Sequence, residues 1–85
     1  MRVTLKLYAS LSDHLPDEAK RTNEWPMEVA DGTTVGELIE RHQLPRRLVH
    51  LVLVNGHYIP PAVRDSRTLV ENDVLAIWPP VAGGM

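Results

Sequence analysis

The residues of this chain best suited to chemistry are its last seven, which combine two prolines, two small residues, two glycines and a methionine. Prolines fix φ and lack an N–H, so we expect the chain to leave its last strand in an extended form. Glycines allow close approach to the backbone and leave the acyl carbon open to nucleophilic attack. The pattern predicts a tail that can enter a narrow channel, although a chain end tolerates almost any residue and Gly-Gly alone is a weak signal. The tail residues are Pro79, Pro80, Val81, Ala82, Gly83, Gly84 and Met85.

Side chains elsewhere show no catalytic or metal-binding pattern. Asp17 and Glu18 are adjacent in a polar stretch, where we expect a solvated loop. The four histidines lack the spacing of metal ligands, and we expect them at the surface or at the rim of a helix. They are His14, His42, His50 and His57. Because the chain has no cysteine, disulfides, thiolate nucleophiles and Cys-bound metals are excluded.

Length and composition restrict the classes of function. A chain of 85 residues predicts one domain, and its formal net charge of -2 argues against a nucleic-acid partner. Four arginines still leave open a small basic patch for an acidic partner, against scattered surface charge. They are Arg46, Arg47, Arg64 and Arg67. No stretch is long and apolar enough to span a membrane, and the start of the chain lacks the apolar run of a signal peptide, so we expect a cytoplasmic protein.

The first half of the chain predicts two strands and one clear helix. Residues 2–8 alternate between apolar and polar side chains, as in a half-buried strand, and residues 25–29 favour a second strand at an edge. Residues 34–42 predict a helix, because Thr34 and Glu37 have the spacing of a capping box and apolar residues follow at i, i+3, i+4 and i+7. Pro45 stops any extension of this helix.

The second half predicts a hairpin and a final strand. Residues 50–59 contain Asn55-Gly56, the strongest two-residue hairpin signal, and we place the strand before it centrally because it is apolar on both faces. Residues 74–78 form the last strand. The order indicates an α+β domain over residues 1–78, with one main helix packed across a mixed sheet, and an extended tail over residues 79–85. The residues expected in one shared core are Leu5, Leu7, Leu38, Ile39, Val52 and Val54.

Several of these segments together resemble a known family. The stretches TTVGEL, VNGHYI and LVENDVLAIWPPVAGG are similar to the small sulfur carriers of the ubiquitin-like β-grasp fold. The nearest members are the small subunit of molybdopterin synthase and the sulfur carrier of thiamine biosynthesis, and the PPVAGG ending especially resembles the former. The resemblance spans nearly the whole chain. It implies a β-grasp domain with a flexible C-terminal Gly-Gly tail.

The resemblance also implies a chemistry. In such carriers a ubiquitin-activating-type enzyme uses ATP and magnesium to adenylate the terminal glycine, and a sulfur donor converts the adenylate into a thiocarboxylate. Here Gly84 would bear the thiocarboxylate, while residues 80–83 would provide clearance and enter the partner's channel. The sulfur would then pass to a precursor held by a synthase large subunit or by another acceptor enzyme. The chain itself would be no enzyme and would hold no metal or permanent cofactor.

The sequence departs from the family pattern in two places. Pro16 and the polar run after it weaken the helix expected between the first two strands. Met85 follows Gly84, so the carboxylate of Gly84 is locked in an amide. We therefore expect a precursor from which a protease removes Met85 by cutting the Gly84–Met85 bond. If that bond stays intact, the chain is no working carrier.

Several alternatives remain open at this stage. Within the family, the carrier can serve thiamine, cysteine or thio-metabolite synthesis in place of molybdopterin synthesis. Outside it, the chain can be a ubiquitin-like modifier joined through Gly84 to lysines of other proteins, or a plain interaction domain. Trp78 either belongs to an apolar partner interface with Pro80 and Val81 or closes the end of the core.

Overall fold

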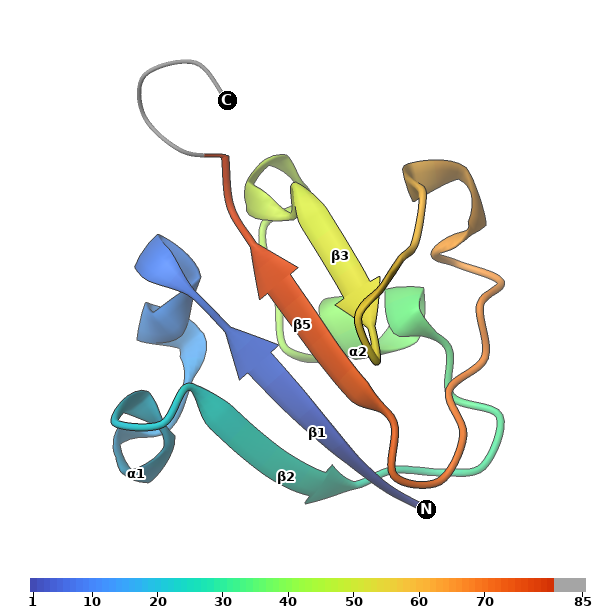
Figure 1. Cartoon of the computed structure of the whole chain (residues 1–85), viewed down its shortest axis with the longest axis horizontal. Helices are drawn as coiled ribbons and strands as arrows, with labels where there is room; N and C mark the ends of the chain where they lie inside the picture. Colours follow the sequence, from blue (N-terminus) through green and yellow to red (C-terminus); the bar gives the residue numbers. More distant parts are fainter. Residues whose placement is uncertain (81–85) are drawn as a thin grey trace.

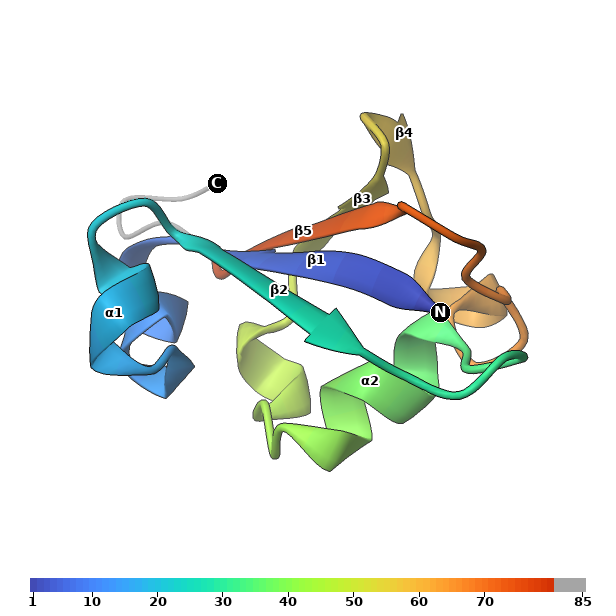
Figure 2. The same cartoon turned by 90° about the horizontal axis from the view of Figure 1, so that it is seen from below.

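Five strands form one mixed sheet, and the helices lie on one of its faces (Figures 1 and 2). The computed structural model describes residues 1–80. The strand order is β2-β1-β5-β3-β4, with β1 and β5 parallel and the other neighbours antiparallel. The first and last strands of the domain therefore lie side by side within the sheet, which confirms the predicted α+β class. The elements are β1 Arg2–Leu7, η1 Ala9–His14, α1 Asp17–Lys20, β2 Glu24–Glu28, α2 Val35–Arg41, η2 Arg46–Leu48, β3 Leu51–Val54, β4 His57–Tyr58, η3 Pro61–Val63 and β5 Val74–Trp78.

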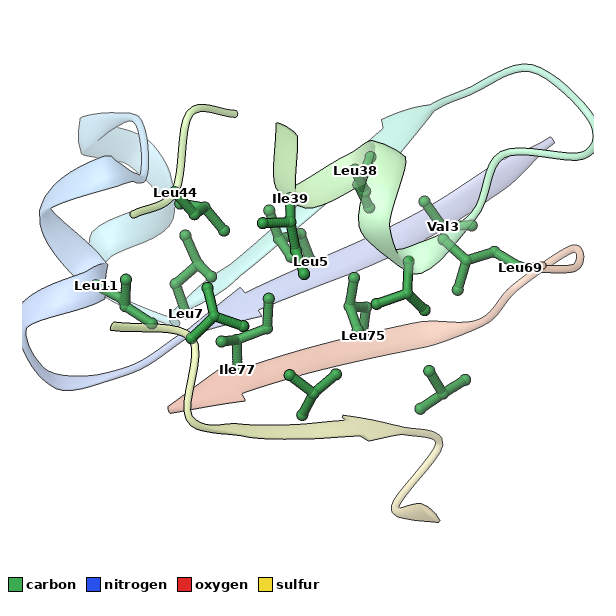
Figure 3. Close-up of a cluster of buried hydrophobic side chains, with 14 of the residues drawn as sticks. Val3, Leu5, Leu7, Leu11, Leu38, Ile39, Leu44, Leu69, Leu75 and Ile77 are labelled. Atoms are coloured by element: carbon green, nitrogen blue, oxygen red, sulfur yellow. The ribbon is translucent and has the colours of Figure 1, made fainter. Parts of the chain in front are cut away.

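The core lies between the sheet and α2, as Figure 3 shows. Alternation along β1 turns Val3, Leu5 and Leu7 toward the helix, and each is no more than 1% exposed. Leu38 and Ile39 of α2 meet them from the other side. All six residues predicted to share one core belong to this buried cluster.

The predicted capping box begins α2. The Thr34 hydroxyl accepts a hydrogen bond from the Glu37 amide at 3.1 Å, and the Glu37 carboxylate accepts one from the Thr34 amide at 2.8 Å. Two orphan amides of the first turn are thus satisfied. The helix ends at Arg41, before Pro45, because Gln43 adopts a positive φ of 55° and redirects the chain.

The Asn55-Gly56 hairpin forms as predicted, with φ values of 50° and 84° that are typical of a type I′ turn. The predicted central position of β3 is wrong, however. The middle of the sheet is β5, and β3 lies between β5 and the two-residue edge strand β4. Both strands are apolar on both faces, so composition alone did not distinguish them. The parallel pairing of β5 with β1 decides the order.

The polar stretch after β1 also differs from the prediction. We expected a solvated loop in the polar stretch that contains Asp17 and Glu18, but Asp17–Lys20 forms the short helix α1. Pro16 precedes this helix and does not interrupt one, since proline fits a helix start, and Asp17 and Glu18 lie in the first turn, where negative charge is favourable. Leu11, Leu15 and Ala19 anchor the segment in the core. The predicted second strand follows as β2, an edge strand that Pro26 protects from further pairing.

Two of the four arginines that left open a basic patch are engaged within the domain, whereas Arg47 and Arg67 are exposed. Arg64 is only 5% exposed, and its guanidinium donates hydrogen bonds to the carbonyl oxygens of Val49, His50 and Ile59. Arg46 pairs with carboxylates of Glu40 and Asp65. Within residues 1–80, no group of three side chains is arranged to hold a metal ion. No helix in that range has the length and apolar character needed to cross a bilayer.

Gly36 provides a test of how α2 docks. The helix amide of Gly36 donates to the Arg64 carbonyl at 2.9 Å, and a Cβ at this position would collide with the Asp65 carboxylate and lie 2.9 Å from the Asp65 Cα. Glycine to alanine within a helix normally stabilises by about 1 kcal/mol. Here we expect Gly36→Ala to destabilise by about 1–3 kcal/mol in denaturant unfolding, because backbone must move. Arg41→Ala, at an exposed position of α2, is the control and should change the stability by less than about 0.5 kcal/mol. A more stable Gly36→Ala variant would contradict this packing.

His42 predicts a pH dependence of stability. Its ring packs against Trp25 with centroids 4.7 Å apart, and its buried Nε2 has no hydrogen-bond partner among the described residues. Burial, helped by the charge of Arg41, holds the pKa of His42 below its usual 6.5. The unfolded chain therefore binds a proton at His42 more readily than the folded chain does. The stability that neutral His42 contributes is complete above pH 6.5 and is lost as the pH falls toward the lower folded pKa. We expect unfolding free energy to decrease over that window, and His42→Leu to flatten the decrease, whereas His14→Gln, at an exposed site, should not. An unchanged profile for His42→Leu would show that His42 is not the titrating group.

Candidate functional site

The sheet topology gathers three chain segments around the start of the tail. Because β1 and β5 are parallel, the carboxyl ends of both strands lie at the same end of the sheet. The antiparallel strand β3 begins at that end. Figure 1 shows the ends of β1 and β5 beside the start of β3. Tyr8, His50 and Trp78 therefore lie together where the chain leaves the sheet. The predicted residues Val81, Ala82, Gly83, Gly84 and Met85 lie outside the described part of the chain. Pro79 is buried and Pro80 is exposed.

Hydrogen bonds hold the end of β5 from both sides. The Tyr8 amide donates to the Ile77 carbonyl at 3.2 Å, and the His50 amide donates to the Trp78 carbonyl at 3.1 Å. The His50 carbonyl in turn accepts from the buried guanidinium of Arg64 at 3.1 Å. The last carbonyl before the two prolines is thus tied to the interior of the domain through His50.

The side chains of Tyr8 and Trp78 stack on the face of the sheet opposite α2. Their ring centroids are 4.4 Å apart and their planes differ by 5°. Lys6 lies on the same face, with its Nζ 5.9 Å from the Tyr8 ring centroid and 3.9 Å from a Glu24 carboxylate oxygen. Interaction with the Tyr8 side chain raises the pKa of Lys6 above its usual 10.5, and Glu24 acts in the same direction. A fixed positive charge therefore borders the aromatic pair.

These rings belong to a larger apolar surface, the open-face patch. It lies on the side of the sheet that α1 and α2 leave uncovered, and Figure 2 shows both helices on the other side. Strand pairing arranges its members in two rows, because Leu51 lies opposite Trp78, and Leu53 lies opposite both Ala76 and Tyr58. Leu51 is 37% exposed and Tyr58 is 55% exposed. Contiguous apolar side chains at a surface are typical of interaction sites. The patch comprises Tyr8, Leu51, Leu53, Tyr58 and Trp78, with Ala76, which is buried, beneath them on the same face of β5.

Trp78 is the one member of this patch that the sequence analysis identified. It is half-buried, and it belongs neither to the buried cluster nor to the side chains packed against that cluster. This position favours an interface residue over one that closes the core, and the interface stays a prediction. The sequence analysis missed the other members. The alternation predicted over residues 2–8 puts Tyr8 on the side of the strand opposite to Leu5 and Leu7, but only the pairing of β1 with β5 brings it to Trp78.

A surface depression beside α2 is a weaker candidate for a site. Charged side chains of Glu37, Glu40, Arg41, Arg46 and Asp65 contribute to its lining. The positive charge of Arg46 in this depression is already neutralised. Its Nη2 lies 3.3 Å from a carboxylate oxygen of Glu40 and 3.2 Å from one of Asp65. The site with the clearest relation to the tail is therefore the open-face patch.

Solved structures of similar fold cover almost the whole chain. The small archaeal modifier protein 1 from Haloferax volcanii is 24% identical, with a TM-score of 0.68 over 99% of this chain and 100% of that one. A chain from the complex of subunits 1 and 2 of molybdopterin-converting factor from Helicobacter pylori 26695 is 22% identical, with a TM-score of 0.61 over 99% and 100%. The small archaeal modifier protein 1 from Methanosarcina acetivorans is 24% identical, with a TM-score of 0.61 over 98% and 96%. These similarities confirm the ubiquitin-like β-grasp fold. No curated protein matches the chain.

The family is shown by a match to a sequence model. The model of the ThiS family matches residues 15–84, which include α1, the capping box of α2, the hairpin and the strand that ends at Trp78. The matched segment ends at Gly84, one residue before Met85. The resemblance drawn from the sequence is thereby confirmed, and the chain belongs to the ThiS family of ubiquitin-like sulfur carriers.

Proposed function

We propose that the chain carries sulfur as a thiocarboxylate on Gly84 and delivers it in cofactor biosynthesis, most closely in molybdopterin synthesis. The observation that carries this proposal is the family match over residues 15–84, whose last residue is the second glycine of the tail. In this function the chain is a carrier subunit that acts with partner enzymes. Residues 1–78 form the folded body, and residues 79–85 form the segment that enters those enzymes.

The chemistry needs a free carboxylate on Gly84, so the Gly84–Met85 bond must first be hydrolysed by a protease. A carboxylate oxygen of Gly84 then attacks the α-phosphorus of magnesium-bound ATP on an adenylating enzyme, and pyrophosphate leaves. Hydrosulfide attacks the carbonyl carbon of the acyl adenylate, AMP leaves with its bonding electrons, and the sulfur loses its proton. The chain has no cysteine, so the thiocarboxylate would be its only ionised sulfur.

The open-face patch is the surface that we assign to the acceptor of the sulfur, a synthase large subunit. The Helicobacter pylori relative belongs to a complex of subunits 1 and 2 of molybdopterin-converting factor, which supports this choice of partner. The patch is apolar, and it lies beside the residue from which the tail begins. Docking of the body would therefore place the tail next to the same partner.

A second function deserves a test because two structural relatives are small archaeal modifier proteins. A modifier would share the activation of Gly84 but transfer it to a lysine amine, forming an isopeptide bond. The product separates the two functions, since a thiocarboxylate indicates a carrier and a conjugate indicates a modifier. Supplying thiolated chain to molybdopterin and thiazole synthases would separate the molybdopterin and thiamine pathways.

The proposed chemistry predicts a difference between two forms of the chain. We expect the form that ends at Gly84, incubated with the adenylating enzyme, ATP, magnesium and sulfide, to exchange one oxygen for sulfur in intact-mass spectrometry. The form that ends at Met85 should remain unchanged, because it offers an amide in place of a carboxylate. Replacing Gly84 by tryptophan should abolish the exchange without altering the melting temperature. Thiolation of the intact Met85-ended form would disprove the hypothesis that the chain is a precursor from which Met85 must be removed.

The proposed docking surface predicts which substitutions weaken binding of the large subunit. We expect Leu51→Lys to weaken the affinity by about tenfold or more in calorimetric titration, because docking would bury a charge against apolar surface. Val63→Lys is the matched control, since Val63 is 43% exposed but lies outside the patch, and it should bind normally. Trp78→Ala should weaken binding by about 30-fold, as for an aromatic interface anchor. If Leu51→Lys binds as tightly as Val63→Lys, the open face is not the docking surface.

A further inference from the structure

We propose that Tyr8 is a positioning residue, whose stacking against Trp78 sets the direction in which the tail leaves the sheet. The proposal rests on the proposed function, because direction matters only if the tail presents Gly84 to an enzyme. It goes further in giving Tyr8 a role in turnover that is separate from docking.

Backbone hydrogen bonding ends at the residue that Tyr8 contacts. The carbonyls of Ile77 and Trp78 are the last of β5 to accept hydrogen bonds from neighbouring segments, from Tyr8 directly after β1 and from His50 directly before β3. Pro79 and Pro80 follow, and neither has an N–H with which to continue the ladder. Proline also fixes its own φ, so a rotation at Trp78 is transmitted along the segment. Pro79 is itself buried, so the side-chain contacts of Trp78 and the burial of Pro79 are the last constraints on the chain before the exposed Pro80.

Tyr8 is well suited to provide this constraint because its own position is fixed. Its amide donates to Ile77, and its carbonyl accepts from the Leu11 amide at 3.1 Å. Leu11 is fully buried in the core. The turn between them is tight, with a φ of 53° at Ala9, and the Ser12 hydroxyl donates to the Ala9 carbonyl at 2.7 Å. The ring of Tyr8 is thus fixed relative to the core, and it contacts Trp78, the last residue of β5.

The stacking geometry itself favours a fixed orientation. Parallel rings 4.4 Å apart restrict the indole of Trp78 on one face, while its backbone carbonyl is held by His50, the residue before β3. Lys6, with its Nζ near the Tyr8 ring and paired to Glu24, borders the tyrosine on its own strand. Loss of the tyrosine ring would remove the stacking partner of Trp78 and leave it with its cross-strand neighbour Leu51 and its backbone bond to His50.

A positioning role has a distinct kinetic signature. The adenylating step needs the carboxylate of Gly84 aligned with the α-phosphorus of ATP, and misalignment lowers the rate of the bound complex. Docking residues, by contrast, change the concentration at which the complex forms. Removing the Tyr8 ring should therefore lower kcat for adenylate formation while KM for the carrier stays nearly constant.

The first experiment measures the direction of the tail without any partner. Because the chain has no cysteine, two spin labels can be placed uniquely, at Ala82→Cys and at the exposed Arg67→Cys. We expect Tyr8→Ala to broaden the distribution of distances between the labels, and Tyr8→Phe to leave it unchanged. Tyr58→Ala removes the other tyrosine of the open-face patch, and it should also leave the distribution unchanged. An unchanged distribution in Tyr8→Ala would overturn the proposal.

The second experiment measures turnover with the chain ending at Gly84, the adenylating enzyme, magnesium ATP and sulfide. We expect kcat to fall about tenfold or more in Tyr8→Ala, with KM within about twofold, and Tyr8→Phe to restore kcat. Tyr8→Leu, which keeps apolar bulk but no ring, should behave as Tyr8→Ala does and covers the case in which alanine unfolds the domain. A higher KM at constant kcat would make Tyr8 a docking residue and overturn the proposal. Broadened distances without thiolation of any form would reject the proposed function and leave the positioning of the tail intact.

Discussion

The pairing of β5 with both β1 and β3 is the constraint on which the rest of this structure depends. It places the last strand in the middle of the sheet, so one face of β5 contributes side chains to the core and the other to the open face. Leu75 and Ile77 pack toward α2, and Ala76 and Trp78 lie on the open face. A central strand also has hydrogen-bond partners on both edges up to its end. The chain therefore leaves the domain from its most firmly held strand.

The same arrangement places the residues that stabilise the fold and those that we assign to partner binding on opposite faces of the sheet. One face of the sheet, together with α2 and the segments around η1 and α1, supplies the buried cluster. The opposite face bears half-exposed apolar side chains that this cluster does not include. A small domain buries a limited share of its surface, so it cannot easily cover two faces of a sheet. In this chain the uncovered face is adjacent to the tail, where a partner that binds the tail can use it.

Two polar features connect the loops to this framework. Arg64 donates from the interior to the carbonyls of Val49, His50 and Ile59, which fixes the segment before β3 and the segment after β4. Its own carbonyl accepts from Gly36 at the start of α2. A buried guanidinium whose three nitrogens each donate to a backbone carbonyl orders irregular segments that have no ladder of their own. Arg64 thus links the helix, the hairpin and the exit of the tail.

Several elements of the fold, and the family, could be predicted from the sequence alone because they depend on local interactions. The capping box of Thr34 and Glu37, the Asn55-Gly56 turn and the alternation of β1 each depend on neighbours within a few residues, so their patterns predicted the elements correctly. The Gly-Gly tail identified the family because it was combined with those elements in the right order. By contrast, α1 was missed because Pro16 can end a helix or precede one, and only the burial of Leu15 and Ala19 decides between them.

The tertiary structure alone decided which strand is central and which residues surround the exit of the tail. Strand order depends on contacts between β1 and β5, which are separated by most of the chain and leave no local signal. Tyr8 and Trp78 each appeared in the sequence as an aromatic residue at the end of a strand. Their stacking follows from the parallel register, which brings two strand ends to the same edge of the sheet. The tail residues were readable from the sequence because their chemistry lies in the backbone, whereas the surface that would present them exists only once the sheet has formed.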